Sequence, residues 1–286
     1  MRKSTDDRRI LLCILAHPDD ESLVTGGLLA HYAAQGVETH LITATRGQRG
    51  WLGDPRANPG SRIMGQRRTA ELEVAAALLG VQHLEILDYM DGELSEVPAP
   101  EIIATLVGYL RRVRPQVVVT FGPDGVDGHP DHIAVSQFTT AAVPAAANPG
   151  YPAGWDWEPH QVDKLYYVGF SQDRWEQICA VCGDGTLQID GATRRHLGWE
   201  DWMGSARLDT RSHRQQVRQA IACHHSQVPA YAALLQLPER VQQQLWGVQE
   251  CYRAFSLVNG GRTVETDLFA GVGPATRRAK SVRRGS

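Results

Sequence analysis

Short apolar segments alternate with helical segments along the first half of the chain, and this alternation constrains the fold more than any other feature. Residues 9–16 (RILLCILA) form a continuous apolar run, which is typical of a strand buried on both faces. Similar patterns predict strands at 37–44, 83–87 and 117–121, with helices at 21–35, 63–79, from 100 onward and at 133–143. Strands that alternate with helices indicate a Rossmann-like α/β fold: an open, mostly parallel sheet with helices on both faces.

The length of 286 residues is compatible with one large domain. We expect residues 1–270 to form a single α/β domain, in which a loop-rich C-terminal portion, 144–270, makes the wall or lid of a pocket. Within that portion, 144–159 is rich in Pro, Gly and Trp and is predicted to be a loop, whereas 164–170 could add a strand. Residues 271–286 carry five basic side chains without apolar periodicity, so we predict a disordered basic tail.

Composition excludes several classes of partner. Lys and Arg number 29 against 32 Asp and Glu, a formal charge of -3, which argues against a nucleic-acid-binding surface. The apolar run at 10–16 is too short for a membrane span or a signal-peptide core, so no membrane partner is expected. Five cysteines, an odd number, suit a reducing compartment and predict a cytoplasmic protein. The oligomeric state stays open, and a homo-oligomer is compatible with the sequence.

The first predicted strand ends in His17-Pro-Asp-Asp-Glu21, which places a histidine and three carboxylates at one strand-to-helix turn. A dinucleotide-binding turn would have glycines here to admit a pyrophosphate, and acidic side chains would repel one. This turn therefore argues against a nicotinamide enzyme and favours a bound cation.

A second polar cluster follows the strand at 117–121. It contains His129, Asp131 and His132, preceded by Asp124 and Asp127. Ligands of open α/β sheets bind at the carboxyl ends of strands, and in the common doubly wound order the first and fourth strands are neighbours. Each cluster alone could merely cap a helix. Together they supply nitrogen and oxygen ligands for zinc, and three such ligands leave a coordination position for water.

Several segments of the chain resemble the LmbE-like (PIG-L) zinc de-N-acetylases, which include deacetylases of the mycothiol and bacillithiol pathways. The resemblance rests chiefly on the paired motifs AHPDDE at 16–21 and GHPDH at 128–132, and it extends over about residues 8–270. Further matching segments are RTAE at 68–71, LLGV at 78–81, DGEL at 91–94, HHSQ at 224–227 and ETDLF at 265–269.

The resemblance implies a zinc ion bound by His17, Asp20 and His132, with Fe²⁺ as a competitor for such ligands in cells. It also implies that Asp19 is the general base and that His129 lies beside the reacting carbonyl. Zinc lowers the pKa of a bound water, and a carboxylate can then accept its proton for attack on an acetamide.

Other roles are less closely fixed by the residues. The resemblance implies that Arg68 and Asp91 bind sugar hydroxyls, although a salt bridge between loop and helix is the alternative. His224 could line the pocket or lie in the core. Asp131 could orient a histidine ligand or cap the following helix. These assignments make Arg68, Asp91 and His224 candidate substrate contacts.

The predicted function is a zinc-dependent hydrolase that removes the N-acetyl group from an N-acetylglucosamine-type sugar conjugate, a small-molecule substrate. One alternative is a zinc amidase that cleaves thiol-sugar S-conjugates and has a larger acyl pocket. Another is a metal-containing binding protein without turnover. Arg46 and Arg49, in the loop after the second strand, could favour an anionic substrate.

Overall fold

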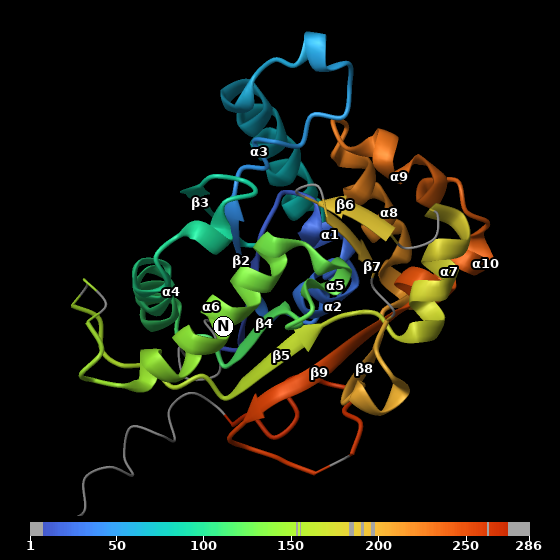
Figure 1. Cartoon of the computed structure of the whole chain (residues 1–286). Helices are drawn as coiled ribbons and strands as arrows, with labels where there is room; N and C mark the ends of the chain where they lie inside the picture. The colour runs from blue at the N-terminus through green and yellow to red at the C-terminus, as the bar shows by residue number, and fades with distance from the viewer. Residues whose placement is uncertain are drawn as a thin grey trace, which may run out of the picture.

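The central feature of the computed structural model is a seven-stranded sheet in the order β3-β2-β1-β4-β5-β9-β8 (Figure 1). The structure describes residues 8–273 apart from 153, 155, 183–185, 190–191, 196–197 and 262, so most of the predicted tail, 274–286, lies outside the described residues. The strands of this sheet are β1 (Ile10–Leu15), β2 (Glu38–Thr45), β3 (His83–Tyr89), β4 (Val117–Phe121), β5 (Lys164–Val168), β8 (Ala206–Asp209) and β9 (Val248–Ser256). A separate hairpin consists of β6 (Thr186–Ile189) and β7 (Ala192–Arg195).

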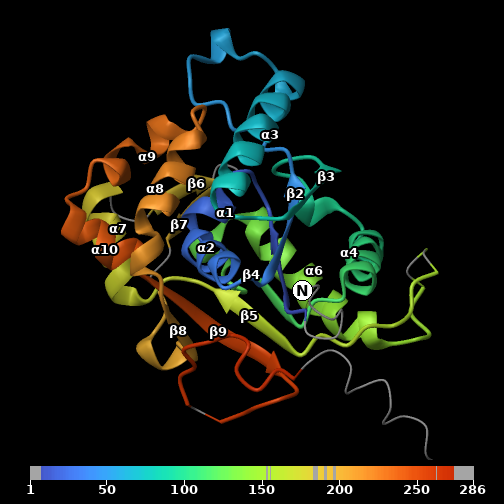
Figure 2. The same cartoon turned by 180° about the vertical axis from the view of Figure 1, so that it is seen from behind.

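Helices cover both faces of the sheet, as Figure 2 shows from behind. Within the described residues the helices are α1 (Asp20–Leu23), α2 (Gly26–Ala34), α3 (Ser61–Leu78), α4 (Ala99–Val113), α5 (Gly125–Gly128), α6 (Pro130–Ala147), α7 (Gln172–Cys182), α8 (Arg214–Cys223), α9 (Val228–Leu235) and α10 (Glu239–Trp246). Helices α4 and α6 lie on one face, and α2 and α8 lie on the other. The predicted α/β fold is therefore confirmed.

Strands β1 and β4 form the buried centre of the sheet. Every residue of both strands is buried, as a continuous apolar run predicts for a strand covered on two faces. Strand β1 pairs in parallel with β2 on one side and with β4 on the other. The strand order reverses between β1 and β4, so the loops that follow them open into one crevice at the carboxyl edge.

The helix predicted over 21–35 is in fact two helices. A single turn, α1, ends before Thr25, and α2 begins at Gly26. The glycines allow a close approach, because a Cβ atom on Gly27 would lie 2.9 Å from the Thr210 hydroxyl oxygen. The break leaves α1 as a short support for the residues that follow β1.

Two other differences concern the C-terminal half. Helix α6 continues through Pro144 to Ala147 instead of ending at 143, since a proline in a last turn removes only one backbone hydrogen bond. Strand β5 forms as predicted, but β9 and β8 extend the sheet in antiparallel fashion and were not predicted. Among the described residues, no helix combines the length and apolar character needed to cross a membrane.

Candidate metal centre and active site

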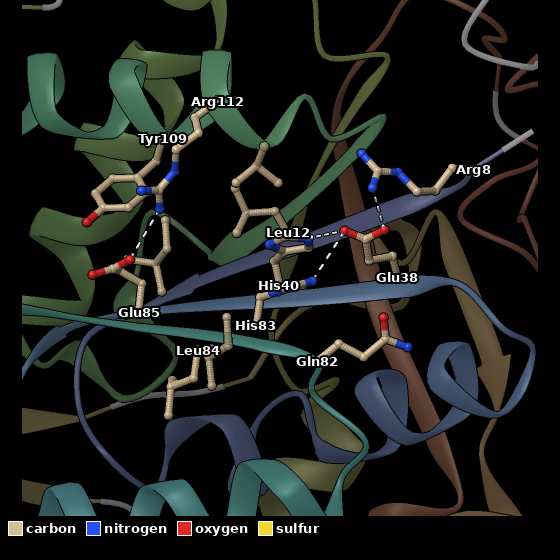
Figure 3. A pocket seen from close by; sticks show the side chains of 13 residues that line it. Arg8, Leu12, Glu38, His40, Gln82, His83, Leu84, Glu85, Tyr109 and Arg112 are labelled. Carbon is tan, nitrogen blue, oxygen red and sulfur yellow. Dashed lines mark hydrogen bonds and ion pairs between the residues drawn. The ribbon is translucent and has the colours of Figure 1, made fainter. Parts of the chain in front are cut away.

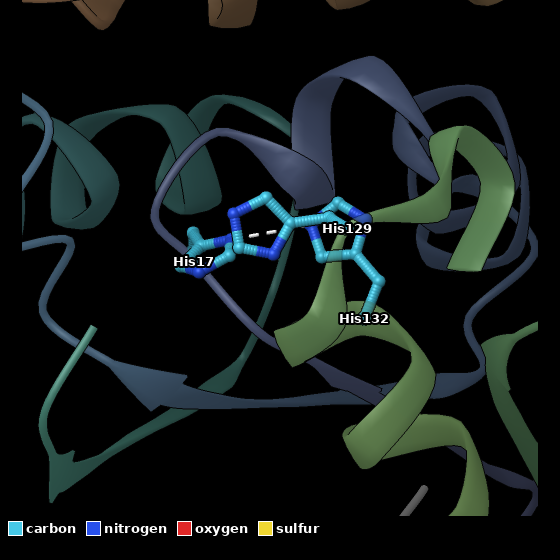
Figure 4. A group of neighbouring side chains, drawn as sticks. All are labelled: His17, His129 and His132. Atoms are coloured by element: carbon cyan, nitrogen blue, oxygen red, sulfur yellow. Dashed lines mark hydrogen bonds between the residues drawn. The ribbon is translucent and has the colours of Figure 1, made fainter. Parts of the chain in front are cut away.

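The loops after β1 and β4 bring three histidines together at the carboxyl edge of the sheet. His17 comes from the first loop, while His129 and His132 come from the start of α6 (Figure 4). They line a cavity of about 550 Å³. The rest of its lining comes from the loops after β1, β2 and β3 and from α1, α3, α5, α6 and α9. These residues are Asp19, Asp20, Leu23, Arg49, Gly50, Leu52, Arg68, Asp91, Gly92, Asp127, Pro130 and Tyr231.

The three residues predicted to bind a metal lie within contact of one another. The Nδ1 atom of His17 is 3.1 Å from Nε2 of His132. One oxygen of Asp20 lies 3.3 Å from that Nε2, and the other lies 3.7 Å from His17 Nδ1. Zinc–ligand bonds of 2.0–2.1 Å separate tetrahedral ligands by about 3.3 Å. His17, Asp20 and His132 therefore fit a single divalent ion.

The outer nitrogen of His17 is held by carboxylates. Its Nε2 lies 3.1 Å from Asp131 Oδ2 and 3.2 Å from Asp91 Oδ1. Asp131 is fully buried and also accepts hydrogen bonds from the backbone N–H groups of Gly92 and Leu94. A proton on Nε2 leaves the lone pair on Nδ1 for a metal. The structure thus places Asp131 against a histidine, as one of its two predicted roles requires.

The outer nitrogen of His132 is held in a similar way. Its Nδ1 lies 3.0 Å from the carbonyl oxygen of Gly125 and 3.3 Å from Asp127 Oδ1. The ring stacks on Phe121 at 4.2 Å, which fixes its plane. Nε2 therefore faces His17 with its lone pair, and the donor chemistry of this site fits a zinc-type ion.

His129 offers a second reading of the metal site, because ligand atoms of His17, His129 and His132 all lie within 4.8 Å of one another. However, Nδ1 of His129 accepts a hydrogen bond from the Asp131 N–H at 3.1 Å. Burial and the nearby charges of His17 and His132 lower the pKa of His129 to about 4. A neutral ring with Nδ1 as acceptor carries its proton on Nε2, so His129 is better suited to donate than to bind a metal.

Asp19 has a strained backbone beside the metal-ligand set. Its φ of 116° lies in the left-handed region, which non-glycine residues seldom adopt. Its backbone N–H donates to Glu21, and its carboxylate accepts from Arg68 Nη2 at 2.9 Å and from the Tyr231 hydroxyl. Burial raises the pKa of Asp19, although Arg68 opposes this effect. The carboxylate is thus held at the cavity with an increased affinity for a proton.

Two of the three predicted substrate contacts line the cavity, and the third does not. Arg68 and Asp91 both line the cavity, but the Arg68 guanidinium is paired with Asp19 rather than with Asp91. Asp91 accepts from the backbone N–H of Arg49 at 2.9 Å. His224 is fully buried and bonds Glu21 at 2.7 Å, outside the cavity lining. The structure therefore does not bring His224 to the pocket.

The two arginines after β2 also differ. Arg46 pairs with Asp88 at 2.9 Å and does not line the cavity, whereas Arg49 lines it and pairs with Glu93. Each guanidinium already faces a carboxylate, and only Arg49 lines the cavity. Of the two arginines, therefore, only Arg49 is placed to contact an anionic substrate.

Tyr231 is a site residue that the sequence analysis missed. It lies on α9 and reaches the Asp19 carboxylate across 212 positions of sequence. No local motif marks it, because it stands in an ordinary apolar helical segment. Within the 144–270 portion, Tyr231 lines this cavity, whereas none of the described residues between 144 and 160 does.

Comparison with known proteins agrees with the motifs. The family model for GlcNAc-PI de-N-acetylase (PIG-L) matches residues 12–143. A 1D-myo-inositol 2-acetamido-2-deoxy-alpha-D-glucopyranoside deacetylase of Thermobifida fusca is 32% identical over 93% of this chain and 100% of the relative.

Solved structures share the fold at lower identity. The N,N'-diacetylchitobiose deacetylase of Pyrococcus horikoshii has a TM-score of 0.63 and 20% identity, covering 86% of this chain and 83% of that one. The 4-carboxy-2-hydroxymuconate hydratase GalB of Pseudomonas putida has a TM-score of 0.58 and 19% identity, covering 88% and 99%. A hydratase with this fold means that the fold alone does not fix the reaction. Together with the full-length sequence match, the paired motifs show that the chain belongs to the PIG-L (LmbE-like) family.

Proposed function

We propose that this protein is a zinc-dependent hydrolase that removes the acetyl group from an N-acetylglucosamine-type conjugate. The observation that carries the proposal is the position of Asp19, a buried carboxylate beside the His17, Asp20 and His132 ligand set in one cavity. A site that only bound a metal would not need a strained carboxylate with a raised pKa next to it.

The chemistry follows from the side chains around the cavity. When bound, zinc would lower the pKa of a water and polarise the acetamide carbonyl. Asp19 accepts the proton of the attacking water, and Arg68 and Tyr231 hold its carboxylate in place. The neutral His129 directs its Nε2–H at the carbonyl oxygen as negative charge develops there. Asp19 then returns the proton to the nitrogen as the C–N bond breaks, which gives acetate and a free amine.

The name of the Thermobifida fusca relative suggests the first substrate to test, 1D-myo-inositol 2-acetamido-2-deoxy-alpha-D-glucopyranoside. Arg49, Arg68 and Asp91 form the polar side of the cavity, where sugar hydroxyls would find donors and acceptors. The test is acetate release from this compound by zinc-loaded protein, with chelator-treated protein as control. Metal-dependent acetate release supports the proposal, and binding of the sugar without acetate release favours the binding-protein alternative.

Proton release gives an independent test of the ligand set. Burial alone would lower the pKa of His17, but Asp131 and Asp91 outweigh it and raise the pKa to about 9. Burial is likewise outweighed at His132, where Asp20 and Asp127 raise the pKa. His17 is thus protonated at pH 7 without metal and must lose a proton to bind one, so zinc binding should release about one proton from this ring.

Calorimetric titration of zinc in two buffers of different ionisation enthalpy measures this release. Zinc affinity should rise between pH 7 and 9. Over the same window the metal-free protein should lose stability, because the contribution of His17 is complete below its unfolded pKa of about 6.5 and disappears as pH rises through about 9. An identical binding enthalpy in both buffers would mean that no proton is released, which would contradict a zinc ligand at His17 that is protonated in the metal-free protein.

A second cavity favours a related activity on larger acyl groups. It has a volume of about 190 Å³ and shares Asp20, His132 and Tyr231 with the site. Its wall is mainly apolar and comes largely from α7, α9 and α10, with Trp175, Ile178, Leu234 and Trp246, and from Phe170 just before α7. An apolar cavity of about 150 Å³ can hold benzene, so this one exceeds the needs of a methyl group. We propose that residues of the 144–270 portion form this wall and that it receives the acyl side of the substrate.

Filling this cavity should separate long from short acyl groups. We expect Ile178→Phe to lower kcat/KM for an N-butyryl glucosaminide by about tenfold or more, since one methylene in an apolar pocket is worth about 1–3 kcal/mol. The N-acetyl compound should change by less than about threefold on the same scale. The matched control is Val74→Phe, at an exposed apolar position on α3. Equal losses for both acyl groups would remove the cavity from acyl recognition.

We propose a cytoplasmic location, and the argument again rests on the cysteines. The thiols of Cys13, Cys223 and Cys251 are free, which suits a reducing compartment. We expect a small-molecule partner and leave a homo-oligomer as a prediction for solution measurements.

A further inference from the structure

A second cluster of potential metal ligands lies at the amino edge of the sheet, opposite the edge that carries His17 and His132. Glu38 and His40 are two positions apart on β2, so their side chains leave the same face of the strand. His83 on β3 is the register partner of His40 in the parallel pair. Two adjacent strands of the sheet, rather than loops, thus position the three side chains.

The ligand atoms converge at metal-binding distances. The Oε1 atom of Glu38 lies 2.9 Å from His40 Nε2 and 3.4 Å from His83 Nε2. The two imidazole rings stack with centroids 4.3 Å apart, and one ligand atom from each residue lies within 4.8 Å of the others. Ligands of a tetrahedral zinc ion are separated by about 3.3 Å, so small side-chain rotations would suffice to bind one.

Figure 3 shows Glu38, His40 and His83 side by side among the side chains that line one pocket. This pocket has a volume of about 470 Å³. The side chains of Glu38 and His40 are 16% and 13% exposed, whereas that of His83 is 57% exposed, so one side remains open to water or a fourth ligand. Arg8 contacts the other oxygen of Glu38 at 3.1 Å, which leaves Oε1 directed at the imidazoles.

We propose that Glu38, His40 and His83 form a second binding site for a transition-metal ion of the zinc class. Two imidazoles and one carboxylate are the donors that such ions accept, and a fourth position is open for water. A bound ion would link the amino ends of β2 and β3. The site uses none of the residues assigned to the reaction, so it can exist whether or not the proposed function is correct.

Zinc stoichiometry of the full chain tests this site. Chelator-treated protein is dialysed against Zn²⁺ at a series of free concentrations, and bound zinc is measured per chain. We expect two ions for the unchanged protein and for the control His225→Gln, which alters an exposed histidine outside both clusters. The double variant that carries both His40→Gln and His83→Gln should bind one ion. The single variant His132→Ala should retain the ion at the amino edge.

The single variant His83→Gln guards against misfolding, because this side chain is largely exposed. His83→Gln should lower the zinc affinity of the second site by about 10- to 100-fold or more, because loss of a partner behind a metal ligand already costs that much. Its circular dichroism spectrum should be unchanged. The proposal is overturned if the double variant still binds two ions. It is also overturned if the unchanged protein binds a single zinc ion and His132→Ala abolishes the binding of that ion. A loss of zinc from His225→Gln as large as that from the double variant would overturn it as well. Failure of acetate release alone would affect only the proposed function.

Discussion

Replacing Asp19 with asparagine is expected to lower kcat by about 10²- to 10⁴-fold, the usual contribution of a positioned general base. Asparagine has the same shape and tolerates the left-handed backbone at this position, where φ is 116°. Its amide can still accept from Arg68 and Tyr231, but it cannot take a proton from water. The fold and the metal content should therefore persist while turnover is lost.

The measurement combines steady-state acetate release with metal analysis of the same sample. Asp88→Asn is the matched control, because Asp88 is an exposed carboxylate that pairs with Arg46 away from the cavity. We expect its kcat to stay within about twofold, as is usual for surface substitutions. If Asp19→Asn keeps both its metal and its full rate, Asp19 is not the base.

The second large effect is expected at His132. His132→Ala removes the Nε2 atom that faces His17 at 3.1 Å and should abolish zinc binding at this edge. A metal ion contributes several kcal/mol to such reactions, and each 1.4 kcal/mol is a factor of ten. We therefore expect kcat/KM to fall by at least about 10³-fold.

His129→Ala provides the comparison that separates ligand from donor. As a hydrogen-bond donor to the carbonyl oxygen, His129 should be worth about 10²- to 10³-fold in kcat, with the metal retained. Loss of zinc from His129→Ala together with retention in Asp20→Ala would instead favour the three-histidine site. Zinc content is measured at a free concentration too low to fill the amino-edge cluster.

The parts of the site that the sequence predicted are those encoded by short segments. The residues 17–21 and 129–132 each follow a fully buried strand, and the sheet reverses its order between those strands. General rules of α/β topology then place both segments in one crevice. For this reason the meeting of His17 with His132 could be expected before the structure was known.

Contacts between segments that are far apart in the sequence could not be predicted from such motifs and topology rules. Tyr231 and Asp19 are 212 positions apart, and His224 and Glu21 are 203 apart, so no spacing rule links them. Strand β8 has only four residues, too few for a clear alternating pattern, and its place in the sheet depends on pairing with β9. The close approach of Thr210 to Gly27, just after the break between α1 and α2, is another long-range contact.

The most direct test of the central claim is anomalous diffraction at the zinc absorption edge from crystals of zinc-loaded protein. The account predicts a strong peak bonded to His17 Nδ1, His132 Nε2 and a carboxylate oxygen of Asp20, each at about 2.0–2.2 Å. A peak that contacts His129 in place of Asp20, or no peak between the β1 and β4 loops, would contradict it.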